Sequence, residues 1–427
     1  TAVGSQSGFS NTTGTMTAVG YQSLCSNTTG DRNTAIGHES LKTNVTGSYN
    51  TGIGYQSLCK NTNGDYNVAV GDAVLFSNTT GHSNVGVGRS SLLSNTTGVA
   101  NVALGKDALF VNTTGAFNTA LGHSALKCNV SGTNNVAVGM CALFNNTCGA
   151  NVAVGLTALM SNTTGTCNTA LGHRALCANI CGNKNTGLGY FALRENTTGQ
   201  NNVAVGWGTL YTNKCNDNVA VGMCSLYSNT TGFRNTGLGM CSLRANTSGK
   251  CNTSIGYASM NANTVGIENV VVGAAAMISN TIGSQNTALG FRALNANTTG
   301  CNNTAVGLNA LCTLTVGNRN TAVGRNSLIN MSGSGDRNNT AIGYSTGATV
   351  TTGFNLTLLG YSAEPSSATA TNEITLGDTN VDCFRIPGLN YTIDNGGDVT
   401  LAANKKVIFG DSGEHIAGDG TNLAITT

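Results

Sequence analysis

The sequence repeats one short unit along most of its length. A glycine preceded by an aliphatic residue recurs 23 times between Gly4 and Gly377, and 18 of the 22 intervals are 17 residues long. Three intervals have 16 residues, and the interval from Gly324 to Gly343 has 19. Positions are counted here from this anchor glycine, so that +4 is the fourth residue after it and −1 the residue before it. Self-similarity at a fixed period of this kind predicts a repeat architecture.

The consensus unit is N-[TV]-[AG]-[VIL]-G-x-x-[AS]-L-x-x-N-x-T-G-x-x. Positions −3 to −1 alternate like a short strand with one buried face. The later "NTTG" has asparagine first and glycine fourth, which is typical of a type I turn. Proline is absent before Pro365, as expected for strands that donate every backbone hydrogen bond. One unit is therefore strand, bend, strand and turn, and it has no room for a helix.

Seventeen residues cannot fold alone. Ordering them costs about 25 kcal/mol, whereas burying two aliphatic side chains returns only about 3–6 kcal/mol. Units must therefore stack, and the sequence predicts an all-β protein, a parallel β-solenoid of about 22 coils and about 105 Å in length. Three segments are expected: regular repeats in 1–343, degenerate last coils in 344–377, and a C-terminal β-prism-like segment in 378–427 that holds copies of the chain together.

Residues at one position of successive coils form what we call a ladder. The +4 ladder should lie inside the solenoid, and it contains Leu24, Leu41, Leu58, Leu75, Leu92, Leu109, Leu126, Leu143 and Leu193. The −2 ladder is Ala or Gly from Ala2 to Ala341, except for Ser254 and Val271. Such small residues suit either an outward stripe approached by another chain or a second inner wall. We favour the outward stripe, and with it a side-by-side homotrimer.

The unit "NTAVGxxAL" resembles the head repeats of trimeric autotransporter adhesins of the YadA type, whose pattern is close to N-S-V-A-I-G-x-x-S. This resemblance covers about residues 1–377, and it implies left-handed β-rolls with three chains side by side. The longer unit with its "NTTG" turn also resembles repeats in fibre proteins of phages and large viruses. "NEITLGDTNVDCFRIPGL" and the stretch after it resemble shaft modules of phage tail fibres. The resemblance implies a fibre outside a cell or on a virion.

The composition does not favour an enzyme. Charged residues make up 9% and aromatic residues 5% of the chain, which is low for a globular enzyme of this length. His38, His123 and His173 all follow an anchor glycine, at a variable outward position in distant coils. We predict no catalytic residue, cofactor or metal site. The net charge of +2 gives no case for nucleic acid, and no apolar run is long enough for membrane insertion.

Fifteen cysteines are present, without the C-x-x-C spacing of zinc ligands. Cys224 and Cys241 occupy the same position in successive coils, about 4.8 Å apart, and this separation is within reach of a disulfide. Their parallel side-chain directions make the bridge awkward. The alternative to a disulfide is that these cysteines are simply small residues tolerated in place of Ser or Ala.

Asparagine forms two ladders, at +7 and at −4. Stacked side-chain amides can hydrogen-bond along the axis and lock the register of the coils. Many +7 residues also stand in N-x-[ST] sequons, which predict N-glycosylation in a secreted eukaryotic protein; among them are Asn78, Asn95 and Asn112. Glycans in every coil would crowd one another, so we favour the ladder.

The leading functional hypothesis is a structural fibre or adhesin shaft that holds a binding tip away from a surface. Its partners would be other copies of itself and a cell-surface or glycan receptor. Thr1 to Gly4 is ordinary repeat without a cap, so we expect this coil to be covered either by an upstream segment or by the C-terminal end of another copy. The second arrangement would propagate end to end as a filament. The alternatives are an ice-binding solenoid, which needs a flat Thr-x-Thr face, and a polysaccharide-binding or polysaccharide-degrading solenoid, which needs recurring carboxylates.

Overall fold

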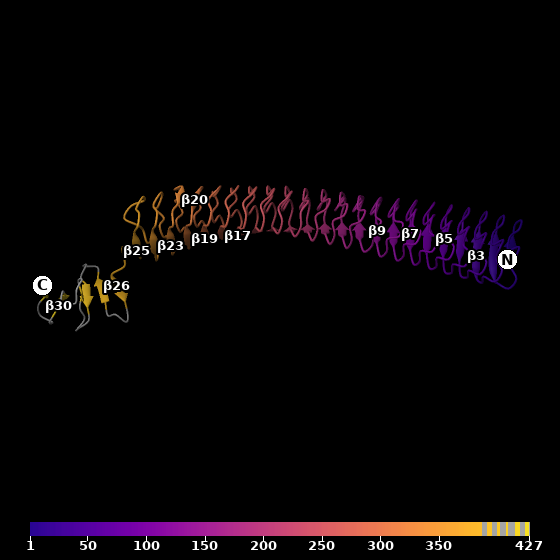
Figure 1. Ribbon diagram of the computed structural model, residues 1–427, viewed down its shortest axis with the longest axis horizontal. Helices are drawn as coiled ribbons and strands as arrows, with labels where there is room; N and C mark the ends of the chain where they lie inside the picture. Colours follow the sequence, from indigo (N-terminus) through magenta and orange to yellow (C-terminus); the bar gives the residue numbers. More distant parts are fainter. Residues whose placement is uncertain (387–390, 395–398, 402–406, 409–414, 419–422, 427) are drawn as a thin grey trace.

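The computed structural model describes residues 1–386, 391–394, 399–401, 407–408, 415–418 and 423–426. Up to about residue 377, the chain is a parallel β-solenoid of about 22 turns that forms a long rod (Figure 1). The described part contains strands and turns but no helix. The predicted fold class, an all-β parallel solenoid with repeats of about 17 residues, is confirmed.

Each turn contributes one short strand to a 23-stranded parallel sheet. Successive strands pair in register, so that Ala18 faces Ala35 and Ala153 faces Ala170. The strands of this sheet are β1 (Ala2–Val3), β2 (Met16–Val19), β3 (Asn33–Ile36), β4 (Thr51–Ile53), β5 (Val68–Val70), β6 (Val85–Val87), β7 (Val102–Leu104), β8 (Thr119–Leu121), β9 (Val136–Val138), β10 (Val152–Val154), β11 (Thr169–Leu171), β12 (Thr186–Leu188), β13 (Val203–Val205), β14 (Val219–Val221), β15 (Thr236–Leu238), β16 (Thr253–Ile255), β17 (Val270–Val272), β18 (Thr287–Leu289), β19 (Thr304–Val306), β21 (Thr321–Val323), β23 (Thr340–Ile342), β24 (Thr357–Leu359) and β25 (Ile374–Leu376). In the 19-residue interval, β20 (Gly317–Asn318) and β22 (Gly335–Asp336) form a separate parallel pair.

The +4 ladder lies inside the rod. All nine leucines named from the sequence are fully buried, and Met260 and Met277 take the same place in two later coils. These residues have positive φ, as in Leu193 at +51°. This is an uncommon conformation for a side chain of this size, so the surrounding coils must hold it in place. Leu193 illustrates the result, because it lies entirely within the apolar core.

The −2 ladder is also inside, so the outward stripe predicted from its small size is wrong. Ala18, Ala35 and Ala69 are fully buried, and the second-inner-wall interpretation is the correct one. The rod is thin, and the +4 leucines already occupy the space opposite this wall. A Cβ added at Gly187 would lie 3.3 Å from Leu176 Cγ, so little more than a methyl group fits.

The anchor glycine is required for two reasons. Its φ is strongly positive, for example +134° at Gly172, and only glycine adopts this conformation without strain. A Cβ at Gly172 would also lie 2.5 Å from the carbonyl oxygen of Gly189 in the next coil. The positive φ recurs at every anchor, and the close backbone neighbour in the next coil recurs at every anchor before Gly377. Together they explain why this position is glycine throughout the repeat.

The C-terminal segment changes architecture after β25. Strands β26 (Cys383–Ile386), β27 (Tyr391–Asp394) and β28 (Val399–Leu401) form one antiparallel sheet. A second antiparallel sheet contains β29 (Val407–Ile408), β30 (His415–Gly418) and β31 (Leu423–Thr426). An intertwined prism of three chains stays a prediction, because the structure is of one chain.

Candidate functional site

The +7 asparagines form a continuous ladder of hydrogen bonds inside the rod. The Nδ2 of Asn78 donates to Asn61 Oδ1 at 2.7 Å and to the carbonyl oxygen of Gly81 at 2.9 Å. Asn95 and Asn112 repeat this arrangement, each donating to the preceding asparagine at 2.8 Å. Both hydrogens of each amide are therefore used, one along the axis and one within the coil.

The −4 asparagines form a second ladder beside the first. The backbone N–H of Asn67 donates to Asn50 Oδ1 at 3.0 Å, and Asn67 Nδ2 donates to the same oxygen at 3.1 Å. Asn67 Nδ2 also reaches the carbonyl oxygen of Gly81, at 2.9 Å, which is the acceptor used by Asn78. One backbone carbonyl thus joins the two ladders in most coils; it belongs to glycine, except in two coils where Cys148 and Cys215 supply it. Such a satisfied buried network fixes the coils to one register.

The two ladders end differently. Leu314, Met331 and Val350 replace asparagine at +7 in the last coils, and the Oδ1 of Asn297 is left buried without a hydrogen-bond partner. The −4 ladder ends at Asn339, whose Oδ1 accepts the backbone N–H of Leu356 at 3.0 Å. The +7 ladder therefore ends with an unsatisfied acceptor, whereas the −4 ladder ends satisfied.

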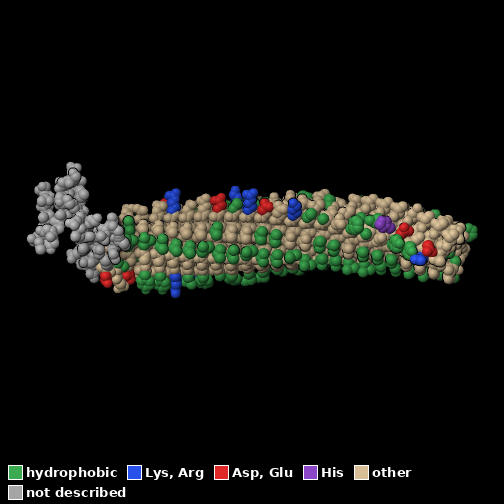
Figure 2. Space-filling view, turned by 90° about the horizontal axis from the view of Figure 1, so that it is seen from below, with side chains coloured by type: hydrophobic (Ala, Val, Ile, Leu, Met, Phe, Trp, Pro, Cys, Tyr) green, Lys and Arg blue, Asp and Glu red, His purple; other side chains and the backbone are tan. Residues whose placement is uncertain are grey.

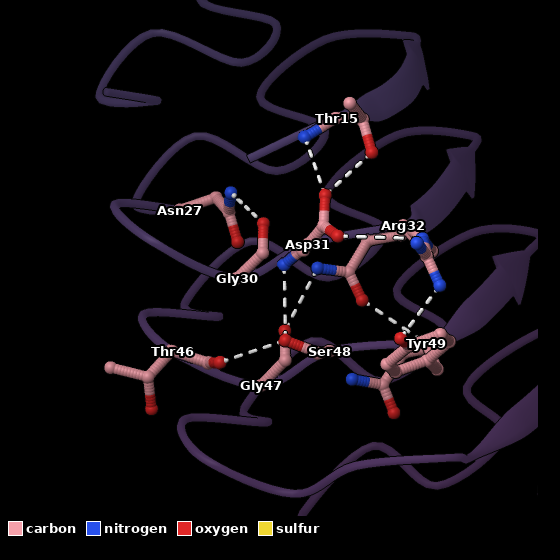
Figure 3. Close-up of polar contacts among 11 residues, drawn as sticks. Thr15, Asn27, Gly30, Asp31, Arg32, Thr46, Gly47, Ser48 and Tyr49 are labelled. Carbon is pink, nitrogen blue, oxygen red and sulfur yellow. Dashed lines mark hydrogen bonds and ion pairs between the residues drawn. The ribbon is translucent and has the colours of Figure 1, made fainter. Parts of the chain in front are cut away.

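The outer turns add polar contacts between coils at the surface (Figure 3). Asp31 Oδ1 accepts from the backbone N–H of Thr15 at 2.8 Å and from its hydroxyl at 2.5 Å. These hydrogen bonds hold the pKa of the Asp31 carboxyl below its usual range. Arg32 donates to the hydroxyl of Tyr49 at 2.7 Å. Figure 3 also shows the Asn27 amide donating to the carbonyl oxygen of Gly30.

The predicted glycosylation residues belong to the +7 ladder. Asn78, Asn95 and Asn112 have no exposed surface, and each amide makes the two hydrogen bonds described above. Attachment of a glycan would require the amide to leave the ladder. The geometry of these three side chains thus favours the ladder interpretation.

The predicted cysteine pair lies in successive coils, as the repeat requires. Cys224 donates its backbone N–H to Trp207 and Cys241 donates to Met223. Both thiols are free, as are the other cysteines whose side chains the structure describes. Burial raises the pKa of the Cys224 thiol, and the neighbouring Cys241 raises it further. A disulfide between them stays a prediction.

Two of the three histidines at +1, His38 and His173, pack on neighbouring rings. His38 stacks between Tyr21 and Tyr55, with ring centroids 5.1 and 5.3 Å apart. His173 meets Tyr190 edge-on at 5.0 Å. These contacts give His38 and His173 a packing role along the outside of the rod. Within the described residues, no three His, Cys, Asp or Glu side chains are grouped to hold a metal ion.

The outward face of the 23-stranded sheet is the surface that sequence reasoning missed. Its −3 ladder is Thr or Val in β2 to β24, and its −1 ladder is Val, Ile or Leu in every strand. Ile36, Leu104, Leu121 and Leu171 in the −1 ladder are 40–50% exposed. Figure 2 shows hydrophobic side chains in rows along the rod. We call the −3 and −1 ladders together the apolar sheet face, and no charged residue interrupts it.

Among the residues that the structure describes, no helix has the length and the hydropathy needed to span a bilayer. The chain matches no protein-family model, no curated protein and no solved structure.

Proposed function

We propose that this chain is the shaft of a non-enzymatic fibre or adhesin outside a cell or on a virion, in which copies associate side by side through the apolar sheet face. The observation that carries this proposal is the uncharged face along the whole 23-stranded sheet, made of the aliphatic −1 ladder and the Thr or Val −3 ladder. Support for a shaft comes from the continuous rod and from the two amide ladders, which tie each coil to its neighbours. The task of such a part is mechanical: to hold another element at a fixed distance.

The size of the apolar sheet face supports association. A length of about 105 Å and a width of three strand residues, about 10 Å, give about 1,000 Å² per chain. Soluble monomers rarely expose a contiguous apolar patch above about 300–600 Å². Two such faces together exceed the roughly 1,600 Å² of a standard stable interface. A second copy has the matching shape, because the same ladders recur at the same spacing along it.

Three chains per fibre is the stoichiometry that we propose. It rests on the resemblance of the repeat to trimeric adhesin heads and on the expectation that residues 378–427 clamp three chains. The receptor would be a cell-surface molecule or a glycan. Growth end to end into a filament is a further form that the same fibre could take, and particle length distinguishes the two.

The experiment measures the mass and length of the full-length protein by analytical ultracentrifugation and electron microscopy. We expect trimers, and we expect monomers from the double variant Leu104→Lys with Leu171→Lys, because both charges would be buried in the interface. The matched control is Thr97→Lys with Thr164→Lys, which places the same charges on the exposed turn. A monomeric wild type, or equal dissociation of both double variants, would refute side-by-side association through this face. Particles many times longer than one rod would indicate end-to-end growth.

One observation favours ice binding as a second candidate. The −3 ladder presents threonines such as Thr169 and Thr186 in register on adjacent strands of the sheet. Two observations weigh against it. First, the −1 ladder beside it is aliphatic rather than a second row of threonine. Second, the threonine hydroxyls at +8 already donate hydrogen bonds to the next coil, as Thr79 does to the carbonyl oxygen of Thr96 at 3.1 Å. A thermal-hysteresis measurement on the purified protein decides between the candidates, since only ice binding predicts a gap between melting and freezing.

A further inference from the structure

The buried +7 ladder contains an unusual number of glycosylation sequons. Eleven of its fully buried asparagines are followed by any residue and then by Ser or Thr. They are Asn27, Asn44, Asn78, Asn95, Asn112, Asn129, Asn162, Asn196, Asn229, Asn246 and Asn297. The sequence thus marks each of these asparagines as a site for glycan attachment, whereas the folded structure makes each of them inaccessible.

The ladder leaves no place for a sugar. Asn162 Nδ2 uses its two hydrogens to reach Asn146 Oδ1 at 2.7 Å and the carbonyl oxygen of Gly165 at 2.9 Å. A Cβ added at Gly165 would already lie 2.4 Å from Asn162 Oδ1 and 2.8 Å from Asn179 Nδ2. If a methyl group does not fit beside the amides, a pyranose ring does not fit either.

The ladder does not depend on the sequon. Asn263 and Asn280 are followed at +9 by Val265 and Ile282, and both keep their bonds to the preceding asparagine at 2.8 Å. In the coils with sequons, the +9 residue lies on the exposed turn. Thr80, for example, makes no side-chain hydrogen bond to the described residues. The sequon hydroxyl can therefore be removed while the ladder stays intact.

We propose that the +7 sequons are dormant N-glycosylation sites, open in the unfolded chain and closed in the rod, so that glycan transfer and rod formation exclude each other. In the transfer, Asn Nδ2 forms a bond to C1 of a sugar carried on a lipid pyrophosphate. The bond from C1 to the pyrophosphate oxygen breaks, the lipid pyrophosphate leaves, and Nδ2 loses one proton. That proton is one of the two that the ladder needs. The rod must therefore form before, or outside, any compartment in which this transfer acts on unfolded chains.

Further sequons lie outside the +7 ladder, and three exposed ones provide an internal comparison. Asn302, Asn338 and Asn355 also precede Ser or Thr by two residues, and all three are exposed. Asn355 Nδ2 makes a surface bond to Asn372 Oδ1 at 2.7 Å, well away from the core. Glycans at these positions are compatible with the folded coil. The proposal therefore concerns buried sequons, which are those of the +7 ladder and Asn252 in the −4 ladder, and not sequons in general.

The test expresses the full chain in one eukaryotic cell line by two routes, in the cytosol and with a secretion signal. Mass spectrometry after enzymatic deglycosylation gives the occupancy of each sequon, and electron microscopy identifies rods. We expect rods from the cytosol. From the secretory route we expect occupied +7 sites in molecules without rods, and empty +7 sites in any rods that form, whatever the occupancy of Asn302, Asn338 and Asn355.

The decisive variant, called the +9 variant, replaces the +9 Ser or Thr by Ala in all eleven coils and Ser254 by Ala, which removes the buried sequon at Asn252 of the −4 ladder. Its matched control is Asn302→Gln with Asn338→Gln and Asn355→Gln. The +9 variant should form rods by both routes, whereas the control should behave as wild type. Rods that carry glycans at Asn78, Asn95 or Asn112 would overturn the proposal. So would a +9 variant that forms rods in the cytosol but none when secreted, since loss of the rod would then have another cause.

Discussion

The contribution of one amide in the +7 ladder to the stability of the rod can be measured by making the same substitution at two positions. Asn179 lies in the middle of the ladder, where it donates to Asn162 Oδ1 at 2.7 Å and accepts from Asn196 Nδ2 at 3.0 Å. Asn297 lies at its end, where it donates to Asn280 Oδ1 at 2.8 Å while its own Oδ1 has no partner. Leucine at +7 is tolerated in this fold, since Leu314 occupies that position natively and is fully buried.

The two leucine substitutions differ in how many polar groups they leave unpaired. Asn179→Leu removes the donor to Asn162 Oδ1 and the acceptor of Asn196 Nδ2, so two buried groups lose a partner. Asn297→Leu removes an acceptor that is already unpaired and leaves Asn280 Oδ1 unpaired instead. The number of unpaired buried groups therefore does not change. An unsatisfied buried group costs about 1–3 kcal/mol. Asn179→Leu should therefore cost about 2–6 kcal/mol more than Asn297→Leu.

Hydrogen–deuterium exchange followed by mass spectrometry is the suitable assay, because a long repeat array does not unfold in one two-state step. The backbone amides of the substituted coil and its two neighbours report the local free energy of opening. The expected difference corresponds to exchange faster by about 30-fold to 10⁴-fold around residue 179 than around residue 297, each relative to wild type. Equal losses at both places would show that shape or volume, rather than hydrogen-bond satisfaction, controls this ladder.

Three further predictions concern an interior leucine, a surface carboxylate and the C-terminal segment. Leu193→Asp should abolish exchange protection in the adjoining coils, because it buries an unpaired charge, while Leu193→Met should be tolerated, as Met277 is in the same ladder. The pKa of Glu39 is lowered chiefly by its hydrogen bond to Lys42. The ionised Glu39 carboxylate therefore stabilises the folded coil at neutral pH, and this stabilisation is lost as pH falls through the lowered pKa. Exchange protection around Glu39 should therefore decline on acidification in wild type and be insensitive to pH in Glu39→Gln. Deletion of residues 378–427 should yield monomers or aggregates by ultracentrifugation, and a stable trimer without them would show that they are dispensable as a clamp.

Much of this fold could be predicted from the spacing of a few residues. The leucine at +4 indicated an interior ladder because a large aliphatic side chain recurs there, as Leu24 and Leu193 show. The asparagines indicated axial hydrogen bonds, since a polar side chain fixed in every coil needs a partner in every coil. The shared carbonyl of Gly81, which joins the two asparagine ladders, was not predictable, because it depends on how the turn brings distant positions together.

The inside and the outside of the strand were assigned the wrong way round. Alternation shows which residues share a face, but not which of the two faces is buried. Ala35 was placed outward for its size, and the structure instead buries it and exposes Ile36. A signal was available in the +1 position, which accepts Tyr, His, Arg and Asp and must therefore face solvent. Position −1 has the same parity as +1, so it faces outward as well.

The +7 ladder also has a direction. Every amide nitrogen in it donates toward the N-terminal side, as Asn78 does to Asn61 and Asn95 does to Asn78. The last finished coil of a partly built rod thus presents a free carbonyl oxygen as a template, and the next coil to be synthesised brings the matching donor. The rod can therefore fold coil by coil during synthesis, because each new coil needs only the coil that precedes it. Leu314 brings no donor to Asn297, so templating by this ladder stops there, and the final coils must find their register by other contacts.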